Sequence, residues 1–463
     1  MSVLSRYIGD KAFYRMTLAV AVPIMLQNGI TNFVSMLDNI MVGRVGTVEM
    51  TGVAVANQLM FVFMLCLFGA VSGAGIFGAQ FYGKGDVEGL RYSFRFKLVL
   101  CAAITLLGAV VIGFWGRDLA DLFLRGEGEV EDAVASLNHA ENYLRIMLAG
   151  LIPTALGQCY ASTLRETGET VLPMKAGIAA VLVNLFFNWV LIFGHLGAPA
   201  LGVEGAALAT IISRFVEMGI LMAWTHRHKA RQPFIVGAWR RIYIPLSLAR
   251  RMLVKGAPLM INESLWAVGI TVINQCYSTR GLEVVAATNI SSTFWNLFSV
   301  TFMATGTAIG IIVGQQLGAG EFHRVRETVR RLIAFSIAIS LFFGGVYALC
   351  AGVIPLMYNT TDAVRSLAAD LMRISALMMP LVSFLHATYF TLRSGGKTGI
   401  TFLFDSGFQL GLAAPVVFLL SRFTDIGILP LYFICQSLDI VKCVMGYLLL
   451  KKGVWIRRIV EEE

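Results

Sequence analysis

The sequence predicts an all-α membrane protein with twelve transmembrane helices. Of its 463 residues, 57% are hydrophobic and only 14% are charged, whereas an ordinary soluble domain has about 25% charged residues. Apolar stretches of roughly 20 residues or more recur along the whole chain, and each is long enough to cross a hydrocarbon core of about 30 Å as a helix. We therefore expect no separate soluble domain.

Short polar segments separate the twelve predicted spans. Residues 1–15 are polar and of mixed charge, and the apolar run after them is too long for a removable signal and lacks its small-residue cleavage site. We keep this run as the first transmembrane helix. The expected spans are 16–41, 51–81, 93–115, 137–163, 171–194, 202–225, 252–278, 286–317, 331–356, 366–392, 400–421 and 427–450.

The most basic stretch of the chain, 226–251, separates two matching halves. The predicted domains are a six-helix bundle over 1–225, a cytoplasmic basic linker over 226–251 and a second six-helix bundle over 252–463. Near the end of the fourth and tenth spans, TLRETGET at 163–170 matches TLRSGGKT at 391–398 with an offset of 228. An offset of 235 aligns Pro23 with Pro258, Asn39 with Asn274, Gly75 with Gly310, Gln80 with Gln315, Gly83 with Gly318, Gly85 with Gly320 and Arg91 with Arg326.

These matches indicate an internal repeat. Two unrelated apolar segments would share Leu and Val by chance, whereas these share Pro, Gly, Gln and Arg at fixed spacing. Six spans per half is an even number, so both copies enter the membrane in the same direction, related by a pseudo-two-fold axis along the membrane normal. Pro23 and Pro258, early in the first helix of each half, are candidate hinges, with a static kink as the alternative.

The net charge of +9 concentrates outside the spans. Lys and Arg gather on the side that holds both termini, which the positive-inside rule places in the cytoplasm. The charge therefore indicates orientation rather than binding of nucleic acid. Neither the seven cysteines nor the six histidines show the spacing of a metal or redox site, so we expect no metal centre and no cofactor.

Asp38 is the most informative polar residue of the spans. It lies in SMLDNIMVGR, near the outer end of the first helix, where an ionised carboxylate costs about 2.5 to 3.5 kcal/mol on insertion scales. Such a charge is tolerated mainly beside a partner, a cavity or a transported ion; the alternative is a solvated residue at the helix end. Asn184 and Asn188, one helical turn apart, and Thr210 can stabilise ionised Asp38 by hydrogen bonds, or can coordinate a small cation such as Na⁺ beside it through hard oxygen atoms.

A proton is the other small cation that Asp38 is expected to bind. A low-dielectric surrounding favours the neutral form of a carboxyl group. One site of this kind can therefore choose between a proton, Na⁺ and a cationic substrate.

The second half carries its acids at other positions. Glu263 lies beside Asn262 in the seventh span, and Asp405 lies early in the eleventh. We expect these three residues, together with Gln27 of the first span, to bind substrate or to attract its charge. An ion pair is the alternative for Glu263, and a solvated position near the cytoplasmic face is the alternative for Asp405.

Three further polar residues are expected to have structural roles. His386 in the tenth span is predicted to be a hydrogen-bonded packing residue. Asp439 and Lys442 stand at positions i and i+3 of one helix and are predicted to pair with each other.

Several sequence motifs, which follow one another along almost the whole chain, resemble those of the multidrug and toxic compound extrusion (MATE) transporters. The matching features are Pro23 and Gln27 followed by LDNIMVG, G-x-Q-x-x-G-x-G after the second span, TLR-x-x-G-x-T in both halves, LVN with LGVEGAALAT, and a final LDIVK with KKGVW. The resemblance implies a V-shaped pair of six-helix bundles. It also implies export of drugs and other organic cations in exchange for H⁺ or Na⁺.

The resemblance assigns roles to single residues. Asp38 matches the family's first-half carboxylate, and Asn184 and Thr210 match two of its partners. Asn188 stands where many members carry a second Asp, and the missing charge would weaken Na⁺ binding and favours H⁺. Glu263 matches an acidic position that some members use for a cation, but the tenth span lacks the acid that accompanies it there, which speaks against such a site in the second half.

The predicted function is a cation-coupled antiporter that exports organic cations, acting as a monomer in a bacterial inner membrane. The alternative is a flippase for lipid-linked glycans, which would need a broad cationic groove; Arg145, Arg214 and Arg373 leave it open. We expect no enzyme, because the chain shows no metal-ligand spacing, no nucleophile beside a base and no phosphate-binding Gly-Lys loop.

Overall fold

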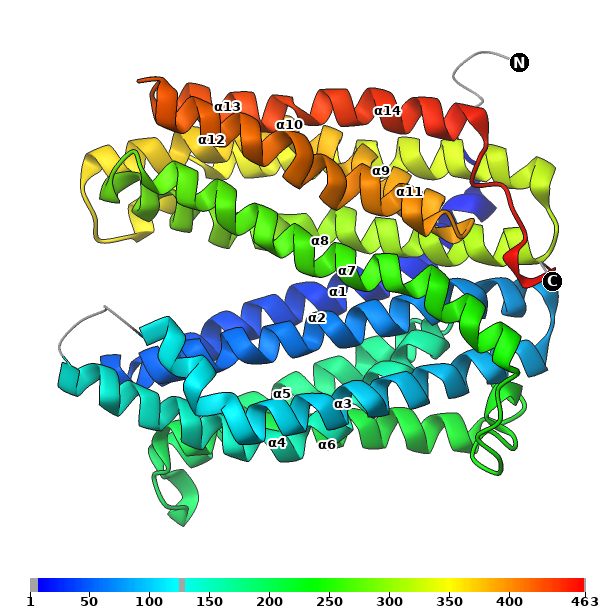
Figure 1. Ribbon diagram of the computed structural model, residues 1–463, viewed down its shortest axis with the longest axis horizontal. Helices are drawn as coiled ribbons and strands as arrows, with labels where there is room; N and C mark the ends of the chain where they lie inside the picture. Colours follow the sequence, from blue (N-terminus) through cyan, green and yellow to red (C-terminus); the bar gives the residue numbers. More distant parts are fainter. Residues whose placement is uncertain (1–6, 125–129, 462–463) are drawn as a thin grey trace. The chain divides into compact units, whose positions relative to one another are not determined.

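The computed structural model describes residues 7–124 and 130–461, which form helices and connecting segments (Figure 1). Twelve helices in this described part are long and apolar enough to cross a membrane, so the predicted fold class is confirmed. The α-helices are α1 (Lys11–Gly43), α2 (Thr47–Lys84), α3 (Val87–Leu124), α4 (Val130–Glu166), α5 (Val171–Phe193), α6 (Gly202–Arg227), α7 (Leu246–Ser278), α8 (Leu282–Gly318), α9 (Phe322–Cys350), α10 (Asp362–Ser394), α11 (Thr398–Phe402), α12 (Ala414–Phe423), α13 (Ile428–Ser437) and α14 (Asp439–Lys452). Short 3-10 helices cover His195–Gly197, Pro233–Ile235, Ile354–Met357 and Ile459–Glu461.

The last two predicted spans are interrupted helices. The eleventh consists of α11, two π-helical segments and α12, and the π-helical segments are η5 (Leu403–Gly407) and η6 (Gln409–Ala413). Pro415, at the start of α12, has no N–H to donate to the preceding turn, which favours a change of hydrogen-bond register before it. The twelfth span consists of α13 and α14, which meet at Leu438.

Contacts divide the chain into two compact units. The N unit comprises Leu26–Gly78 and Asp86–Leu253, and the C unit comprises Met1–Met25, Ala79–Gly85 and Val254–Glu463. The first part of α1 and the end of α2 thus belong to the C unit, although they come from the first half of the sequence. The predicted domain limits follow the sequence repeat and remain a prediction.

Each unit is built by packing long helices side by side. In the N unit, α4 packs against α3 and α6, and α5 packs against α6 (Figure 1). In the C unit, α10 packs against α8, α9 and α14. Small residues allow such close approach: a Cβ atom added at Gly205 of α6 would lie 2.6 Å from the carbonyl oxygen of Leu191 on α5.

The repeated Q-x-x-G-x-G segments, 80–85 and 315–320, contact each other inside the C unit. An added Cβ at Gly83 of α2 would overlap the backbone carbonyl of Gln315 on α8, and one at Gly318 would overlap that of Gln80. Because residues 83 and 80 match 318 and 315 in the repeat, the same contact is made twice, as a two-fold relation requires. Gln80 also donates to the carbonyl of Ser394, at 2.9 Å.

Replacing Gly83 or Gly318 by Ala is expected to destabilise the protein, because the methyl group would collide with backbone rather than with a movable side chain. Overpacking of this kind costs about 1–3 kcal/mol, and the thermal midpoint of the detergent-solubilised protein measures it. Gly345→Ala is the control, since a Cβ on that residue of α9 would meet nothing within 4 Å. Equal midpoints for Gly83→Ala and Gly345→Ala would contradict the predicted packing.

Candidate cation and substrate sites

Three helices of the N unit bring the predicted cation ligands together. Asp38 lies near the end of α1, Asn184 and Asn188 lie one turn apart on α5, and Thr210 lies on α6. The close approach of α5 and α6 brings the side-chain amide of Asn184 within 3.3 Å of Thr210 Oγ1. Asn188 Nδ2 donates to Asp38 Oδ1 at 2.7 Å. The four side chains therefore form one cluster, with Asp38 half-buried among them.

The amide of Asn184 fits two states of Asp38. One of its terminal atoms lies 3.1 and 3.0 Å from the two carboxylate oxygens of Asp38. If this atom is the nitrogen, it donates to both oxygens of an ionised carboxylate. If it is the oxygen, it accepts from Asn188 Nδ2 at 3.2 Å, and three oxygens then face one another. That second arrangement needs a proton on Asp38, or a cation between the oxygens, to be stable.

Asn188 supplies a second acceptor to the cluster. Only 2% of the residue is exposed, and its Oδ1 atom has no hydrogen-bond partner in the described part of the chain. A buried acceptor without a partner is costly. A proton donor or a cation bound in the cluster would satisfy it, so the donor set fits a small cation.

Tyr143 and Arg214 complete this region, and neither was predicted as a site residue. Tyr143 of α4 is buried and hydrogen-bonded to Thr210. Arg214 acts electrostatically on Asp38 and forms an ion pair with Glu217 at 2.9 Å. The sequence contained a signal for Arg214, which follows Thr210 by one helical turn. Nothing in the sequence distinguishes Tyr143 from the other tyrosines.

Gln27, predicted to bind substrate or to attract its charge, is in contact with Arg165. Its Oε1 atom accepts from Nη2 of Arg165, at the end of α4, at 2.9 Å. The residues that contact Gln27 are therefore not those of the Asp38 cluster. Arg165 was not singled out by sequence reasoning, although it belongs to the repeated TLR motif.

In the C unit, Asp405 and Asn262 are in direct contact. Asp405, within the π-helical segment η5, accepts from Lys442 Nζ at 2.7 Å and from Asn262 Nδ2 at 3.1 Å. The Asn262 side chain is 1% exposed, and its Oδ1 accepts from the backbone N–H and the hydroxyl of Ser406, at 3.2 and 2.7 Å. Asp405 is therefore held in a network rather than solvated.

Asp439 and Lys442 interact electrostatically, but the close ion pair of Lys442 is not the predicted one. Lys442 forms its ion pair with Asp405 on another segment, and its ammonium group lies 5.2 Å from the ring centroid of Phe404. Helical spacing allows the local pair, but a buried ammonium is best stabilised by a carboxylate that approaches within the packed interior. Only the tertiary structure brings Asp405 there.

The C unit also contains the remaining predicted residues. Glu263 follows Asn262 on α7 and interacts electrostatically with Arg393 and with Asp405. His386 packs against the ring of Phe302, with centroids 4.9 Å apart. Pro23 and Pro258 lie inside the continuous helices α1 and α7, where their role as hinges remains a prediction.

The three intramembrane arginines that kept the flippase alternative open each have an acidic partner on the same helix. Arg145 pairs with Glu141 at 2.6 Å, Arg214 with Glu217 at 2.9 Å and Arg373 with Asp370 at 2.8 Å. Within residues 7–124 and 130–461, no group of three or more His, Cys, Asp or Glu residues is placed to hold a metal ion.

Comparisons with known proteins show which proteins the chain resembles. A family model described as MatE matches residues 23–190 and 258–419, one segment in each half of the repeat. The chain is 25% identical to the probable multidrug resistance protein NorM of Thermotoga maritima over 95% of this chain and 93% of the relative. It is 26% identical to the probable multidrug resistance protein YoeA of Bacillus subtilis over 89% and 88%.

Solved structures with the same fold are also similar over nearly their whole length. A variant of the MATE transporter VcmN from Vibrio cholerae has a TM-score of 0.86 at 18% identity, covering 96% of this chain and 99% of that one. A MATE protein in a bent conformation has a TM-score of 0.83 at 17% identity, covering 98% of both chains.

Replacing Lys442 by Met is expected to destabilise the protein more than replacing Lys442 by Met and Asp405 by Asn together. The single change leaves a buried carboxylate without its partner, which costs about 3–5 kcal/mol, whereas removing both charges is often nearly neutral. Thermal midpoints of the wild type, both single variants and the double variant give the coupling between the residues. Additive effects would show that the two groups do not form a pair.

Proposed function

The chain belongs to the MatE family of membrane transporters, and from this premise we propose that it is an antiporter that exports organic cations in exchange for H⁺ or Na⁺. The observation that carries this proposal is the Asp38 cluster. A carboxylate inside a membrane protein is retained mainly where it meets a partner, a cavity or a transported ion. Here its nearest contacts are neutral amides, which can serve both an empty and an occupied site.

The coupling cation binds to Asp38 in this proposal. With the site empty, the nitrogen of Asn184 stabilises the ionised carboxylate. When a proton or Na⁺ arrives, the amide turns its oxygen toward Asp38, and the bound cation stabilises the oxygens that then face one another. The cluster therefore changes its hydrogen bonds with occupancy, which is what a coupling site requires.

The charge of the cluster favours a proton over Na⁺. Asn188 supplies a neutral amide where a second carboxylate would strengthen binding of a metal cation, and affinity for hard cations increases with the number of charged ligands. Arg214 acts on Asp38 as well and further opposes the approach of a cation. A proton needs only one carboxylate.

Glu263 is the C-unit carboxylate that we propose attracts a cationic substrate. The charge of Asp405 is compensated by Lys442, so Asp405 contributes mainly by holding Asn262 in place. Glu263 interacts with Arg393 at a distance rather than through a close ion pair. A hydrophobic organic cation could therefore approach Glu263 without first displacing a bound ammonium group.

Coupling requires that substrate and coupling ion prefer different access states, since equal preferences would shift no equilibrium. We propose that α1, which carries Asp38, changes shape near Pro23 when the occupancy of Asp38 changes. Pro inside a helix removes one hydrogen bond and makes bending easier. The structural relative in a bent conformation is compatible with such a change.

The flippase alternative is less favoured, because Arg145, Arg214 and Arg373 are each neutralised by an acid on the same helix. A broad cationic groove would need unpaired arginines.

As a multi-pass membrane protein, the chain is proposed to function as a monomer in a bacterial inner membrane with both termini in the cytoplasm.

Asp38→Asn is expected to abolish export while leaving the protein folded, because an amide has nearly the same shape but cannot bind a proton or a metal cation in the same way. Efflux of a fluorescent organic cation from proteoliposomes, driven by a pH gradient or by a Na⁺ gradient, measures the effect. Asp425→Asn, in an exposed loop, is the control and should export like the wild type. Undiminished export by Asp38→Asn would remove the proposed mechanism.

Asn188→Asp is expected to increase the dependence of export on Na⁺. A second carboxylate beside Asp38 adds a charged ligand, and the Na⁺ concentration for half-maximal export should fall by about tenfold or more, which corresponds to about 1.4 kcal/mol. The titration is done in the proteoliposomes described above at constant pH. An unchanged or higher half-maximal concentration would show that this position does not contact the coupling ion.

A further inference from the structure

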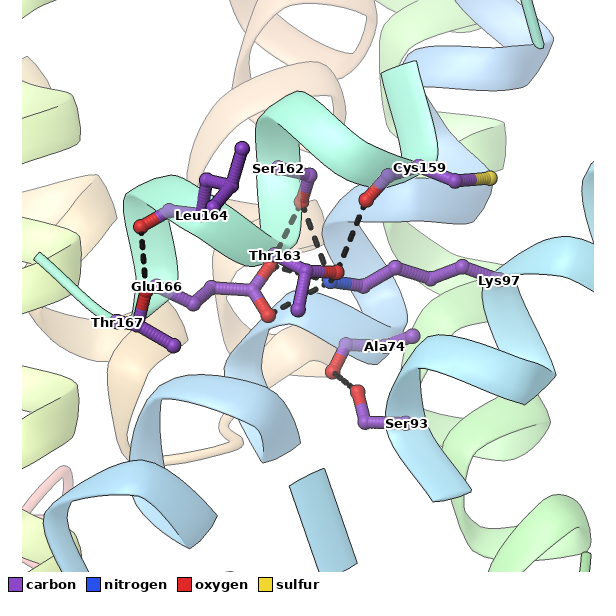
Figure 2. Close-up of polar contacts among 9 residues, drawn as sticks. All are labelled: Ala74, Ser93, Lys97, Cys159, Ser162, Thr163, Leu164, Glu166 and Thr167. Carbon is purple, nitrogen blue, oxygen red and sulfur yellow. Dashed lines mark hydrogen bonds and ion pairs between the residues drawn. The ribbon is translucent and has the colours of Figure 1, made fainter. Parts of the chain in front are cut away.

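A buried ion pair joins α3 to the end of α4 in the N unit. The ammonium group of Lys97 lies 2.6 Å from both carboxylate oxygens of Glu166 and 3.0 Å from the hydroxyl of Thr163. Ser162 donates to the same carboxylate at 2.6 Å. Figure 2 shows Lys97 reaching from its own helix to these residues, with Ser93 and Ala74 beside them. Lys97 is fully buried and Glu166 is 5% exposed.

The helix α2 leaves space for this pair. A Cβ atom added at Gly75 would lie 2.8 Å from Oε1 of Glu166, and one at Gly78 would overlap Oε2. The carboxylate therefore fits against a glycine face of α2, and three helices meet at one ion pair. Its partners satisfy both charged groups, as a buried pair requires.

The second half of the chain builds the matching place without charge. The offsets of 235 and 228 lay Leu332 on Lys97 and Ser394 on Glu166. Leu332 is 1% exposed, and the Ser394 hydroxyl donates to the carbonyl of Gly310, the match of Gly75, at 3.1 Å. The repeated fold therefore does not need an ion pair at this place. Because replacing a buried pair by neutral residues is often favourable, the charges in the N unit call for another explanation.

Arg165 explains why the N unit keeps this charged pair, because Arg165 directly precedes Glu166 and forms a hydrogen bond with Gln27. Arg165 interacts electrostatically with Glu166 and with Glu217, and it donates to Gln27 Oε1 at 2.9 Å. The other end of the Gln27 amide is confined, since a Cβ atom at Gly177 of α5 would lie 2.7 Å from its Nε2. Gln27 is thus fastened to α4 and fitted against α5.

Gln27 lies where the chain of α1 enters the N unit. It is four residues after Pro23, and the N unit begins with Leu26. The hydrogen bond from Arg165 therefore fastens α1 immediately after its candidate hinge. The repeat does not copy this bond, since Asn262, the match of Gln27, contacts Asp405 and Ser406 instead.

We propose that Lys97 and Glu166 are positioning residues that hold Arg165 on Gln27, and that this bond prevents α1 from changing shape at Pro23 when Asp38 has the wrong occupancy. The inference rests on the proposed antiport function. Arg165 directly precedes Glu166 at the end of α4, so the ion pair with Lys97 fixes the turn from which Arg165 reaches Gln27. Without the pair this turn would move more freely, which would release Gln27. The coupling ion would then cross without export of substrate.

Lys97→Leu combined with Glu166→Ser copies the second half and tests this proposal. The thermal midpoint should stay near that of the wild type, whereas dissipation of an imposed ion gradient without substrate should rise by about tenfold, the factor that corresponds to about 1.4 kcal/mol. Gln27→Met should give the same leak, and combining all three changes should add little more. Asp38→Asn introduced into the double variant should abolish the leak, because the leak passes through the transport cycle.

Arg331→Leu combined with Glu327→Ser is the matched control, since it removes a more exposed ion pair of α9 and should leave coupling unchanged. A stable Lys97→Leu, Glu166→Ser protein with wild-type coupling would overturn the inference. If that variant loses its fold, Gln27→Met decides: wild-type coupling in Gln27→Met would overturn the inference equally. Absence of export by the wild type under either gradient would instead refute the proposed function.

Discussion

The cost of placing a charge where water is scarce governs the polar structure of this protein. Buried ions persist only with partners that satisfy them, and the described ion pairs follow this rule in different ways. Lys97 and Lys442 each meet a carboxylate from another helix or segment. Asp38 differs from these pairs, because no basic group among the described residues pairs closely with it. Its contacts are mainly neutral amides, and the neighbouring Arg214 is already paired with Glu217. A carboxylate with such incomplete neutralisation has capacity for a cation.

The two halves share a backbone plan and differ in their charges. The glycine contacts between α2 and α8 are duplicated, so the repeat sets how the helices approach. The polar residues are not duplicated: the N unit has Asp38 with its amides and the Lys97–Glu166 pair, whereas the C unit has Asp405 with Lys442. This division suits the proposed antiport, in which two ligands of different size must be recognised by different groups.

Neutralisation within single helices also distinguishes between transport functions. A cation exporter needs acids that are available to its ligands, whereas a flippase for anionic headgroups needs available bases. Arg145 and Arg373 each lie one turn from an acid that pairs with them, so part of the positive charge that a cationic groove would need is offset on the same helix. Glu263 forms no close ion pair within the described part of the chain and interacts with Arg393 only electrostatically.

The sequence by itself determined the number of spans, the repeat and the grouping of Asn184 with Asn188, because hydrophobic length and helical spacing act locally along the chain. Only the tertiary structure decided that Lys442 pairs with Asp405 rather than Asp439, and that Gln27 meets Arg165. Helical spacing states which residues can share a face, but a buried charge pairs with whichever partner the packed helices bring into reach, and that partner is far away in sequence.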